Sequence, residues 1–406
     1  MTDLLLTGIG HLVTNTGEPG DTAPVLDAAV AITDGKIEWV GATADADSAE
    51  TIIDLEGRAV LPGLVDAHTH IVYAGSRAEE FAKKLAGESY EAILAAGGGI
   101  MDTVRSTRIA TNDQLMDITS RRLGRMAGNG TTTVETKSGY GLDVETEVRI
   151  LKTAALLAEE SGVEVVCTFL GAHVVPTEYR VRRDAYVDLV IEGMIPECAS
   201  HAEFIDVFCD RGAFDLDETR AIIEAGIAHG LRPRLHAEQL ANTGAVDLGV
   251  EMGAISLDHL DHVTPEQAAK MGEAGTIAVL VPGVTLQMRT PPPDVASLRR
   301  AGVTLALASD ANPGTSNVEL MTTVIALGSL LFGMSVEESV WAATRGGALA
   351  LDRGDRGQVV AGSRADLVVL MATHPAHLAY RIDQPVVYGV IMNGEIRHMA
   401  GSRRLI

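Results

Sequence analysis

The segment GLVDAHTHIVYAG, residues 63–75, carries two histidines, His68 and His70, directly after a short apolar run. In an extended strand the side chains of residues i and i+2 point to the same face, so both imidazole rings can reach one point. Converging imidazoles are a common part of a metal site. A single His-x-His at a strand end is more often solvated or hydrogen-bonded, so the metal interpretation depends on what else the chain brings there.

Eight apolar, β-branched runs follow one another along the chain, each followed by turn residues or a helical pattern. They are GLVDAHTH, TTTVET, VEVVCTFLGAH, FIDVFCD, RPRLHAE, AISLDHL, TIAVLVPG and VTLALASDANPG. The helical patterns between them include VETEVRILKTAALLAEESG and LDETRAIIEAGIAHG. This alternation predicts an α/β fold, a TIM-like (β/α)8 barrel whose strands are buried on both sides.

Such a barrel carries its chemistry at the C-terminal ends of its strands. Residues suited to a metal occur at these ends: His68, His70, His173, His236, His259 and Asp310. Neutral imidazoles with one carboxylate suit Zn²⁺ or iron, so we predict that His68, His70, His236 and Asp310 bind a metal. A bound cation lowers the pKa of its water to about 7. Asp310 would hold the proton, and His259 would polarise a substrate carbonyl or orient the water.

Both ends of the chain are rich in short strands and tight turns. The N-terminal part has a hairpin signal at Asp34-Gly35, and the C-terminal part has one at Asn393-Gly394. We therefore predict one small β domain, a β-sandwich, formed by residues 1–60 and 355–406 together. The catalytic barrel would occupy residues 61–354.

Composition excludes several classes of protein. The 406-residue chain has a formal net charge of −23, which argues against nucleic acid or an anionic membrane surface as a partner. Its three cysteines lack Cys-x-x-Cys spacing and lie in or near apolar stretches, so we expect buried, reduced thiols. No signal peptide or 18-residue uncharged apolar span is evident, which predicts a cytoplasmic protein without a membrane span.

The pattern LPGLVDAHTH, followed by His236, His259 and ASDANPG, resembles the amidohydrolase superfamily, in which this barrel is combined with a β-sandwich from both chain ends. Narrower segments resemble the imidazolonepropionase family: HTHIVYAGSRAEEF, AGGGIMDTVRSTR, TTTVETKSGYGLD, FLGAHVVP, DVFCDRGAF, LHAEQ and LASDANPGTS. The resemblance runs from about residue 60 to 320. It implies hydrolysis of 4-imidazolone-5-propanoate, a small-molecule substrate, to N-formimidoyl-L-glutamate. It also implies one Zn²⁺ or Fe³⁺ per subunit and a homodimer.

The resemblance places the metal on His68, His70, His236 and Asp310. It places substrate contacts on Arg77, Tyr140, His173, Gln239, Asn312, Gly314 and Thr315. Arg77 offers a planar fork for the substrate carboxylate, although an Arg after a strand is usually a surface residue. Tyr140 lies in a glycine-flanked stretch, SGYG, that can bring backbone and phenol over a ligand but is as often a loop anchor.

Two positions remain open. Strand alternation from His236 would put Glu238 on the same face and Gln239 on the other, so a contact through Gln239 requires the strand to end before it. Lys137, which we place in the loop after the second strand, is a candidate for the carbamylated lysine that bridges two metals in some superfamily members; we favour one metal. The alternatives are a relative acting on another cyclic amide or a deaminase, and a non-catalytic barrel used for assembly.

Overall fold

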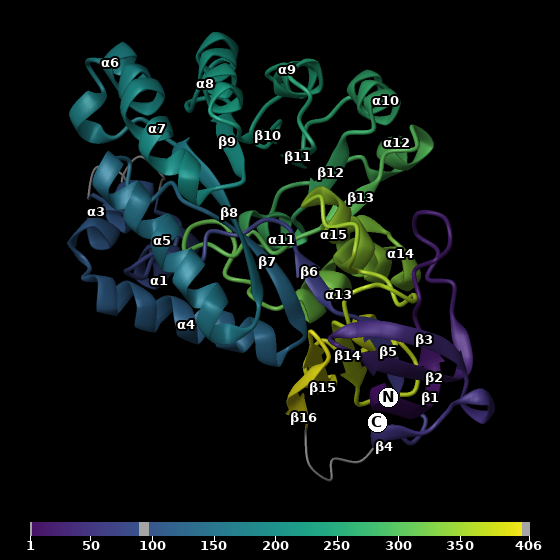
Figure 1. The fold of residues 1–406 in the computed structure, drawn as a ribbon. Helices are drawn as coiled ribbons and strands as arrows, with labels where there is room; N and C mark the ends of the chain where they lie inside the picture. The colour runs from purple at the N-terminus through teal and green to yellow at the C-terminus, as the bar shows by residue number, and fades with distance from the viewer. Residues whose placement is uncertain (1, 89–96, 400–406) are drawn as a thin grey trace.

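The eight predicted barrel runs all form strands of one parallel sheet. In a computed structural model of the chain, described here for residues 2–88 and 97–399, each strand pairs with the next in sequence from β6 to β13. The strands are β6 (Leu64–Asp66), β7 (Thr131–Lys137), β8 (Glu164–Ala172), β9 (Phe204–Cys209), β10 (Arg232–Ala237), β11 (Ser256–His259), β12 (Ile277–Leu280) and β13 (Leu305–Leu307). The predicted (β/α)8 barrel is therefore confirmed (Figure 1).

The barrel closes through the segments that directly follow its first and last strands. Thr69 forms a parallel bridge with Ala311. Around this bridge the Asp310 amide donates to the His68 carbonyl, and the His70 amide donates to the Ala311 carbonyl, both at 3.0 Å. The closure brings the first and last predicted metal-binding segments side by side.

Helices cover the outside of the barrel (Figure 1). Those that follow strands β7 and β9, α5 (Val144–Ser161) and α8 (Leu216–Ala228), coincide with the two helical patterns named above. Asp143 caps α5 through the Thr146 amide, and Gly162, with φ +74°, is the C-cap that follows its last residue. The other α-helices of the described residues are α1 (Ala78–Leu85), α3 (Ile100–Ile109), α4 (Asn112–Gly128), α6 (Arg183–Asp188), α7 (Ile195–Cys198), α9 (Ala245–Glu251), α10 (Pro265–Ala274), α11 (Pro282–Met288), α12 (Val295–Arg300), α13 (Met321–Phe332), α14 (Val336–Trp341), α15 (Gly347–Ala350) and α16 (His377–Tyr380).

Strands from both chain ends form a second, mixed sheet, drawn in purple and yellow in Figure 1. β5 joins the two ends, because it runs parallel to β1 and antiparallel to β14. Both predicted hairpin turns occur, with positive φ at Asp34 and Gly35 and at Asn393 and Gly394. The strands are β1 (Thr2–Leu12), β2 (Val25–Thr33), β3 (Lys36–Ala42), β4 (Ala49–Asp54), β5 (Ala59–Pro62), β14 (Leu367–Leu370), β15 (Val387–Met392) and β16 (Glu395–Met399).

The exact domain limits, 1–60 with 355–406 and 61–354, stay a prediction. The parts of the predicted domains that cover residues 1, 89–96 and 400–406, including Ala96 of the AGGGI segment, lie outside the described residues. Among the helices that the structure describes, none combines the length and the apolar character needed to cross a bilayer.

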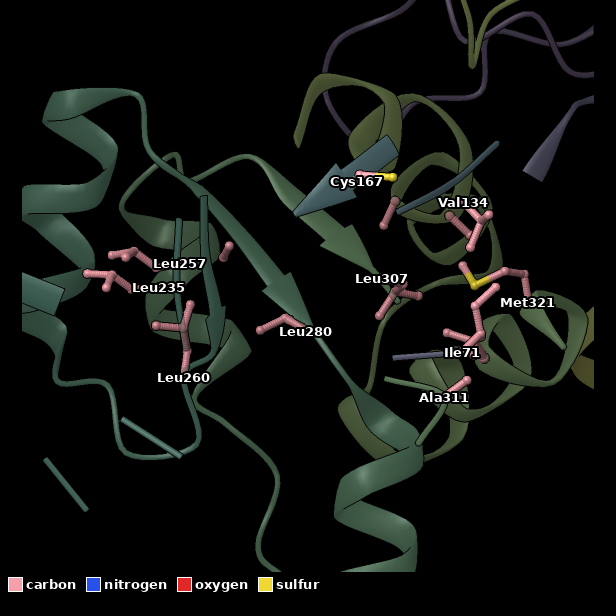
Figure 2. Close-up of a cluster of buried hydrophobic side chains, with 14 of the residues drawn as sticks. Ile71, Val134, Cys167, Leu235, Leu257, Leu260, Leu280, Leu307, Ala311 and Met321 are labelled. Carbon is pink, nitrogen blue, oxygen red and sulfur yellow. The ribbon is translucent and has the colours of Figure 1, made fainter. Parts of the chain in front are cut away.

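The core divides according to strand alternation. Apolar side chains such as Leu235 and Leu257 point outward, because both lie against Gly249 of helix α9 (Figure 2). The alternate residues, including His236, point into the barrel. All three cysteines are buried and unpaired with one another, as expected for reduced thiols. Strand alternation thus separates an apolar outer face, which packs on the helices, from an inner face that carries His236.

Candidate active site at the barrel mouth

Three histidines from β10 and from the segment after β6 converge at the mouth of the barrel. His68, His70 and His236 each have one ring nitrogen that lies within 4.8 Å of such a nitrogen on the other two rings. His68 Nδ1 donates to Asp258 at 2.6 Å, and His236 Nδ1 donates to Asp206 at 2.9 Å. Because the carboxylates occupy both Nδ1 atoms, each ring has Nε2 left for a ligand, which is the usual arrangement of metal-binding histidines.

Asp310 completes the cluster from the segment after β13. Its Oδ1 lies 3.5 Å from His68 Nε2 and 3.3 Å from His70 Nε2. Asp310 has φ +48°, a left-handed conformation that is costly for a residue with a side chain. His68, His259 and Asp310 also form a group with ligand atoms within 4.8 Å.

The donor set fits a metal cation. Among the described residues, His68 Nε2 and Asp310 Oδ1 are buried atoms without a hydrogen-bond partner. A buried polar atom left unpaired costs free energy, whereas a cation between these atoms would satisfy both. Three imidazoles and one carboxylate are ligands that zinc and iron accept.

The electrostatics of the cluster favour positive charge at this point. Burial and Lys137 lower the pKa of His68, but Asp258 and Asp310 outweigh them and raise it to about 9. Burial opposes ionisation of Asp310, yet the imidazoles of His68 and His70 beside its carboxylate hold its pKa well below the ordinary value. A metal ion would replace the proton that these carboxylates otherwise attract.

Sequence reasoning missed the residues that hold the histidines. Asp206 and Asp258 lie inside β9 and β11, and both are completely buried. The sequence does carry a signal for these two residues, because Asp206 and Asp258 are carboxylates that interrupt apolar strand segments, FIDVFCD and AISLDHL. The placement of Lys137 was wrong: it is the last residue of β7, buried and paired with carboxylates, because the strand extends further than the apolar run.

A cavity of about 520 Å³ opens above the cluster. Of the predicted site residues, His68 lies beneath it and the others line it: His70, Arg77, Tyr140, His173, His236, Gln239, His259, Asp310, Asn312, Gly314 and Thr315. A volume of this size suits a small-molecule ligand. The structure therefore brings the predicted residues together.

His173 and His259 are uncharged in this environment. Burial lowers the pKa of His173 to about 3 and that of His259 to about 4. His173 Nδ1 donates to the Gly139 carbonyl at 3.1 Å, and its ring stacks on His70 with centroids 5.2 Å apart. His259 has φ +79° and a buried Nδ1 without a hydrogen-bond partner among the described residues. Both can therefore offer neutral imidazole nitrogens to a ligand.

Tyr140 lies in a loop that is fixed rather than loose. The carboxylate of Glu147, in α5, accepts hydrogen bonds from the amides of Gly139, Gly141 and Leu142 at 2.7 to 2.8 Å. Gly139 has φ +100°, and a Cβ there would lie 2.9 Å from His173 Nδ1. The glycines thus let the loop pack tightly around His173, and the Tyr140 ring lies 5.5 Å from the His173 ring.

Arg77 lines the cavity, but part of its fork is already occupied. Its Nε donates to Glu80 Oε2 at 3.0 Å and its Nη2 donates to Glu80 Oε1. Glu80 also accepts from the Gly99 amide, at the start of α3, at 2.8 Å. A Cβ on Gly314 would lie 2.3 Å from Arg77 Nη1. Gly314 therefore packs against Nη1, the end of the guanidinium that Glu80 does not contact.

The segment after Asp310 is a turn held by Asn312. Its side chain accepts from the amides of Gly314 and Thr315 at 2.8 Å and donates to the Asp310 carbonyl at 2.6 Å. The Thr315 hydroxyl lies 3.4 Å from Asp310 Oδ2. Asn312 therefore shapes the loop, which presents Gly314 and Thr315 to the cavity.

Strand β10 ends at Ala237, as a contact through Gln239 requires. Glu238 has φ +54° and is completely buried, and its carboxylate accepts from the Gly244 amide and from Gln267 Nε2. The backbone therefore turns at Glu238, which binds the next loop, and Gln239 lines the cavity.

Comparison with known proteins gives a consistent result. A model described as the amidohydrolase family matches residues 81–398. The chain is 48% identical to the imidazolonepropionase of Mycolicibacterium smegmatis, over 98% of each chain. It is 50% identical to that of Salinispora arenicola, over 97% of this chain and 98% of the relative.

Solved structures with the same fold are more distant in sequence. An adenosine deaminase from Xanthomonas campestris with bound zinc has a TM-score of 0.76 at 20% identity, covering 100% of this chain and 94% of that one. An N-isopropylammelide isopropylaminohydrolase from Burkholderia multivorans has a TM-score of 0.74 at 20% identity, covering 100% of both chains. These likenesses establish the fold, whereas the near full-length identities establish the family. The chain belongs to the imidazolonepropionase family of the amidohydrolases.

Proposed function

We propose that the chain hydrolyses the cyclic amide of 4-imidazolone-5-propanoate to N-formimidoyl-L-glutamate. The observation that carries this proposal is the identity of 48 to 50% to imidazolonepropionases over nearly the whole chain. In the reaction, the oxygen of water bonds to the ring carbonyl carbon. The bond from that carbon to the ring nitrogen breaks, and a proton from the water moves to that nitrogen.

His68, His70, His236 and Asp310 would hold one metal ion, either Zn²⁺ or Fe³⁺. The unpartnered Nε2 of His68 and Oδ1 of Asp310 support this assignment. When bound, such an ion supplies a Lewis acid that acidifies water and polarises a carbonyl oxygen.

Asp310 and His259 would handle the proton and the carbonyl. Asp310 is ionised because its pKa is held well below the ordinary value, so it can accept a proton from water and pass it to the leaving nitrogen. His259, neutral because burial lowers its pKa to about 4, would donate a hydrogen bond to the developing oxyanion or orient the water. Gln239 cannot act as a base, so it would serve in binding.

The substrate would lie in the cavity with its propionate at Arg77. The other proposed contacts are Tyr140, His173, Gln239, Asn312, Gly314 and Thr315, which line the same cavity. Tyr140 remains a phenol that can donate a hydrogen bond, because burial raises its pKa well above the ordinary value.

The test is incubation of the purified protein with freshly generated 4-imidazolone-5-propanoate, following the loss of its ultraviolet absorbance. We expect turnover that stops when the metal is chelated and returns when Zn²⁺ is added. A panel of cyclic amides and aminated rings without a carboxylate serves as the comparison. Activity mainly on uncharged rings would instead identify a deaminase or another cyclic amidohydrolase.

The metal and the assembly complete the proposal. Elemental analysis should find one Zn or Fe per chain, as the ligand set suggests. We also propose a homodimer, by similarity to the family, and light scattering on the purified protein measures this directly.

A further inference from the structure

Among the described residues of the barrel interior beneath the histidines, salt bridges connect a group of five completely buried side chains. They are Glu135 and Lys137 on β7, Asp206 on β9, Arg234 on β10 and Asp258 on β11. Removing a charge from water costs several kcal/mol unless partners compensate it. The contacts within this group show which side chains compensate one another.

Lys137 lies at the centre of the group. Its Nζ is 2.8 Å from Glu135 Oε1, 2.9 Å from Asp206 Oδ2 and 3.5 Å from Asp258 Oδ2. Two of these carboxylates are the acceptors for the metal-site histidines, Asp206 for His236 and Asp258 for His68. The Lys137 ammonium therefore links the two carboxylates that hold the rings of His68 and His236, which come from opposite parts of the barrel.

The two carboxylates depend on Lys137 to different degrees. Asp258 also accepts from Arg234 Nη2 at 3.0 Å and from the Ser256 hydroxyl at 2.8 Å. Within residues 2–88 and 97–399, Lys137 is the only Lys or Arg in a salt bridge with Asp206. Without the ammonium, Asp206 would keep the hydrogen bonds from the His236 amide and Nδ1 but would lose its Lys partner, so we expect the His236 ring to be affected more than the His68 ring.

The third partner, Glu135, supports the segment that carries the other two histidines. Its Oε2 accepts from the Thr69 amide at 3.1 Å, and its backbone carbonyl accepts from the Thr69 hydroxyl at 2.6 Å. Thr69 separates His68 from His70. Glu135 and Lys137, at the end of β7, therefore contact the residues that hold His68, His70 and His236.

We propose that the Lys137 ammonium is a positioning group that holds Asp206 and Asp258, and through them the rings of His236 and His68, at the spacing that the metal ion requires. Lys137 touches neither substrate nor metal in this role. The inference rests on the proposed metal site. If that site were wrong, the unsubstituted protein would bind no metal, whereas failure of this inference would leave metal binding unchanged in the variants.

The experiment measures the Kd for Zn²⁺ of the full chain, stripped of metal, by competition with a chromogenic chelator. Lys137→Met keeps a long apolar side chain but removes the charge, and we expect Zn²⁺ to bind 10- to 100-fold more weakly, the usual effect of losing the outer partners of a ligand. Circular dichroism and the Tm of the metal-free protein report the fold separately. Lys270→Met is the matched control. Lys270, on the surface of α10, pairs with Asp247 of α9, so the Kd of this variant for Zn²⁺ should equal that of the unsubstituted protein.

A second variant keeps the test decisive if Lys137→Met does not fold. Lys137→Met with Glu135→Gln removes a buried charge pair together, which is often tolerated, and Gln can still accept from the Thr69 amide. We expect the same 10- to 100-fold weakening, because Asp206 and Asp258 still lose their ammonium. A Kd within threefold of the unsubstituted protein in either folded variant would overturn the proposal.

Discussion

Replacement of Arg77 by Ala tests how the site recognises a carboxylate. Glu80 already accepts from Nε and Nη2 of this guanidinium, so the Nη1 end beside Gly314 is the part left to face a substrate. A single hydrogen bond to a charged group contributes about 1.5 to 3 kcal/mol, less than a bidentate pair would. Because 1.4 kcal/mol corresponds to a factor of 10, kcat/KM should fall about 10- to 150-fold.

The remaining Glu80 complicates the single variant, because its carboxylate would then repel the propionate. Arg77→Met with Glu80→Gln removes both charges, so its loss of activity reports the missing contact alone and should be smaller than that of Arg77→Ala. Arg77→Lys should recover part of the activity, because it restores charge without the planar fork.

The assay compares 4-imidazolone-5-propanoate with an analogue that lacks the carboxylate. For the analogue, Arg77→Ala should change kcat/KM little, because the removed group has no partner there. Metal content should stay at the unsubstituted level. Equal losses for both compounds would contradict a carboxylate contact and would show that Arg77 supports the loop through Glu80.

Three further outcomes are expected. His68→Ala or Asp310→Ala should abolish turnover and reduce metal content while circular dichroism stays unchanged; near-normal activity with metal bound would exclude these residues as ligands. Gly314→Ala should raise KM with the metal retained, because its Cβ would lie 2.3 Å from Arg77 Nη1; an unchanged KM would argue that the propionate binds elsewhere. The buried cysteines should not react with a thiol reagent at pH 8 until the protein is denatured, since burial raises their pKa, to about 12 for Cys167, and suppresses the thiolate. Rapid labelling of the native protein would contradict this.

Features set by local chemistry or by a general rule of the fold could be predicted from the sequence. The Asp34-Gly35 turn depends on two residues that tolerate positive φ, so the signal is local. The meeting of His68 with Asp310 follows from the barrel, in which strand ends gather at one face whatever their separation in the chain.

Features set by pairing between distant side chains could not be predicted. Nothing in the sequence around Asp206 says that its partners are Lys137 and His236, because these contacts depend on the stagger of three strands. The contact of Arg77 with Glu80 was also missed, although the two residues are close in sequence, because the start of α1 fixes their relative direction. The family resemblance placed the substrate carboxylate on the Arg77 fork, and the structure shows that Glu80 already binds part of that fork.

The pairing of β5 with β14 has a consequence for how the chain acquires its structure. Val60 and Val369 are neighbours across these strands, and all the barrel strands lie in the stretch of chain that separates them. Contacts between such distant segments form slowly, because bringing them together reduces the conformational entropy of the long chain between them. During synthesis β5 emerges long before β14, and its buried apolar side chains and unpaired edge stay open meanwhile. Docking of the C-terminal strands is therefore expected to be the last folding step, and the interval before it is when this enzyme is most exposed to aggregation.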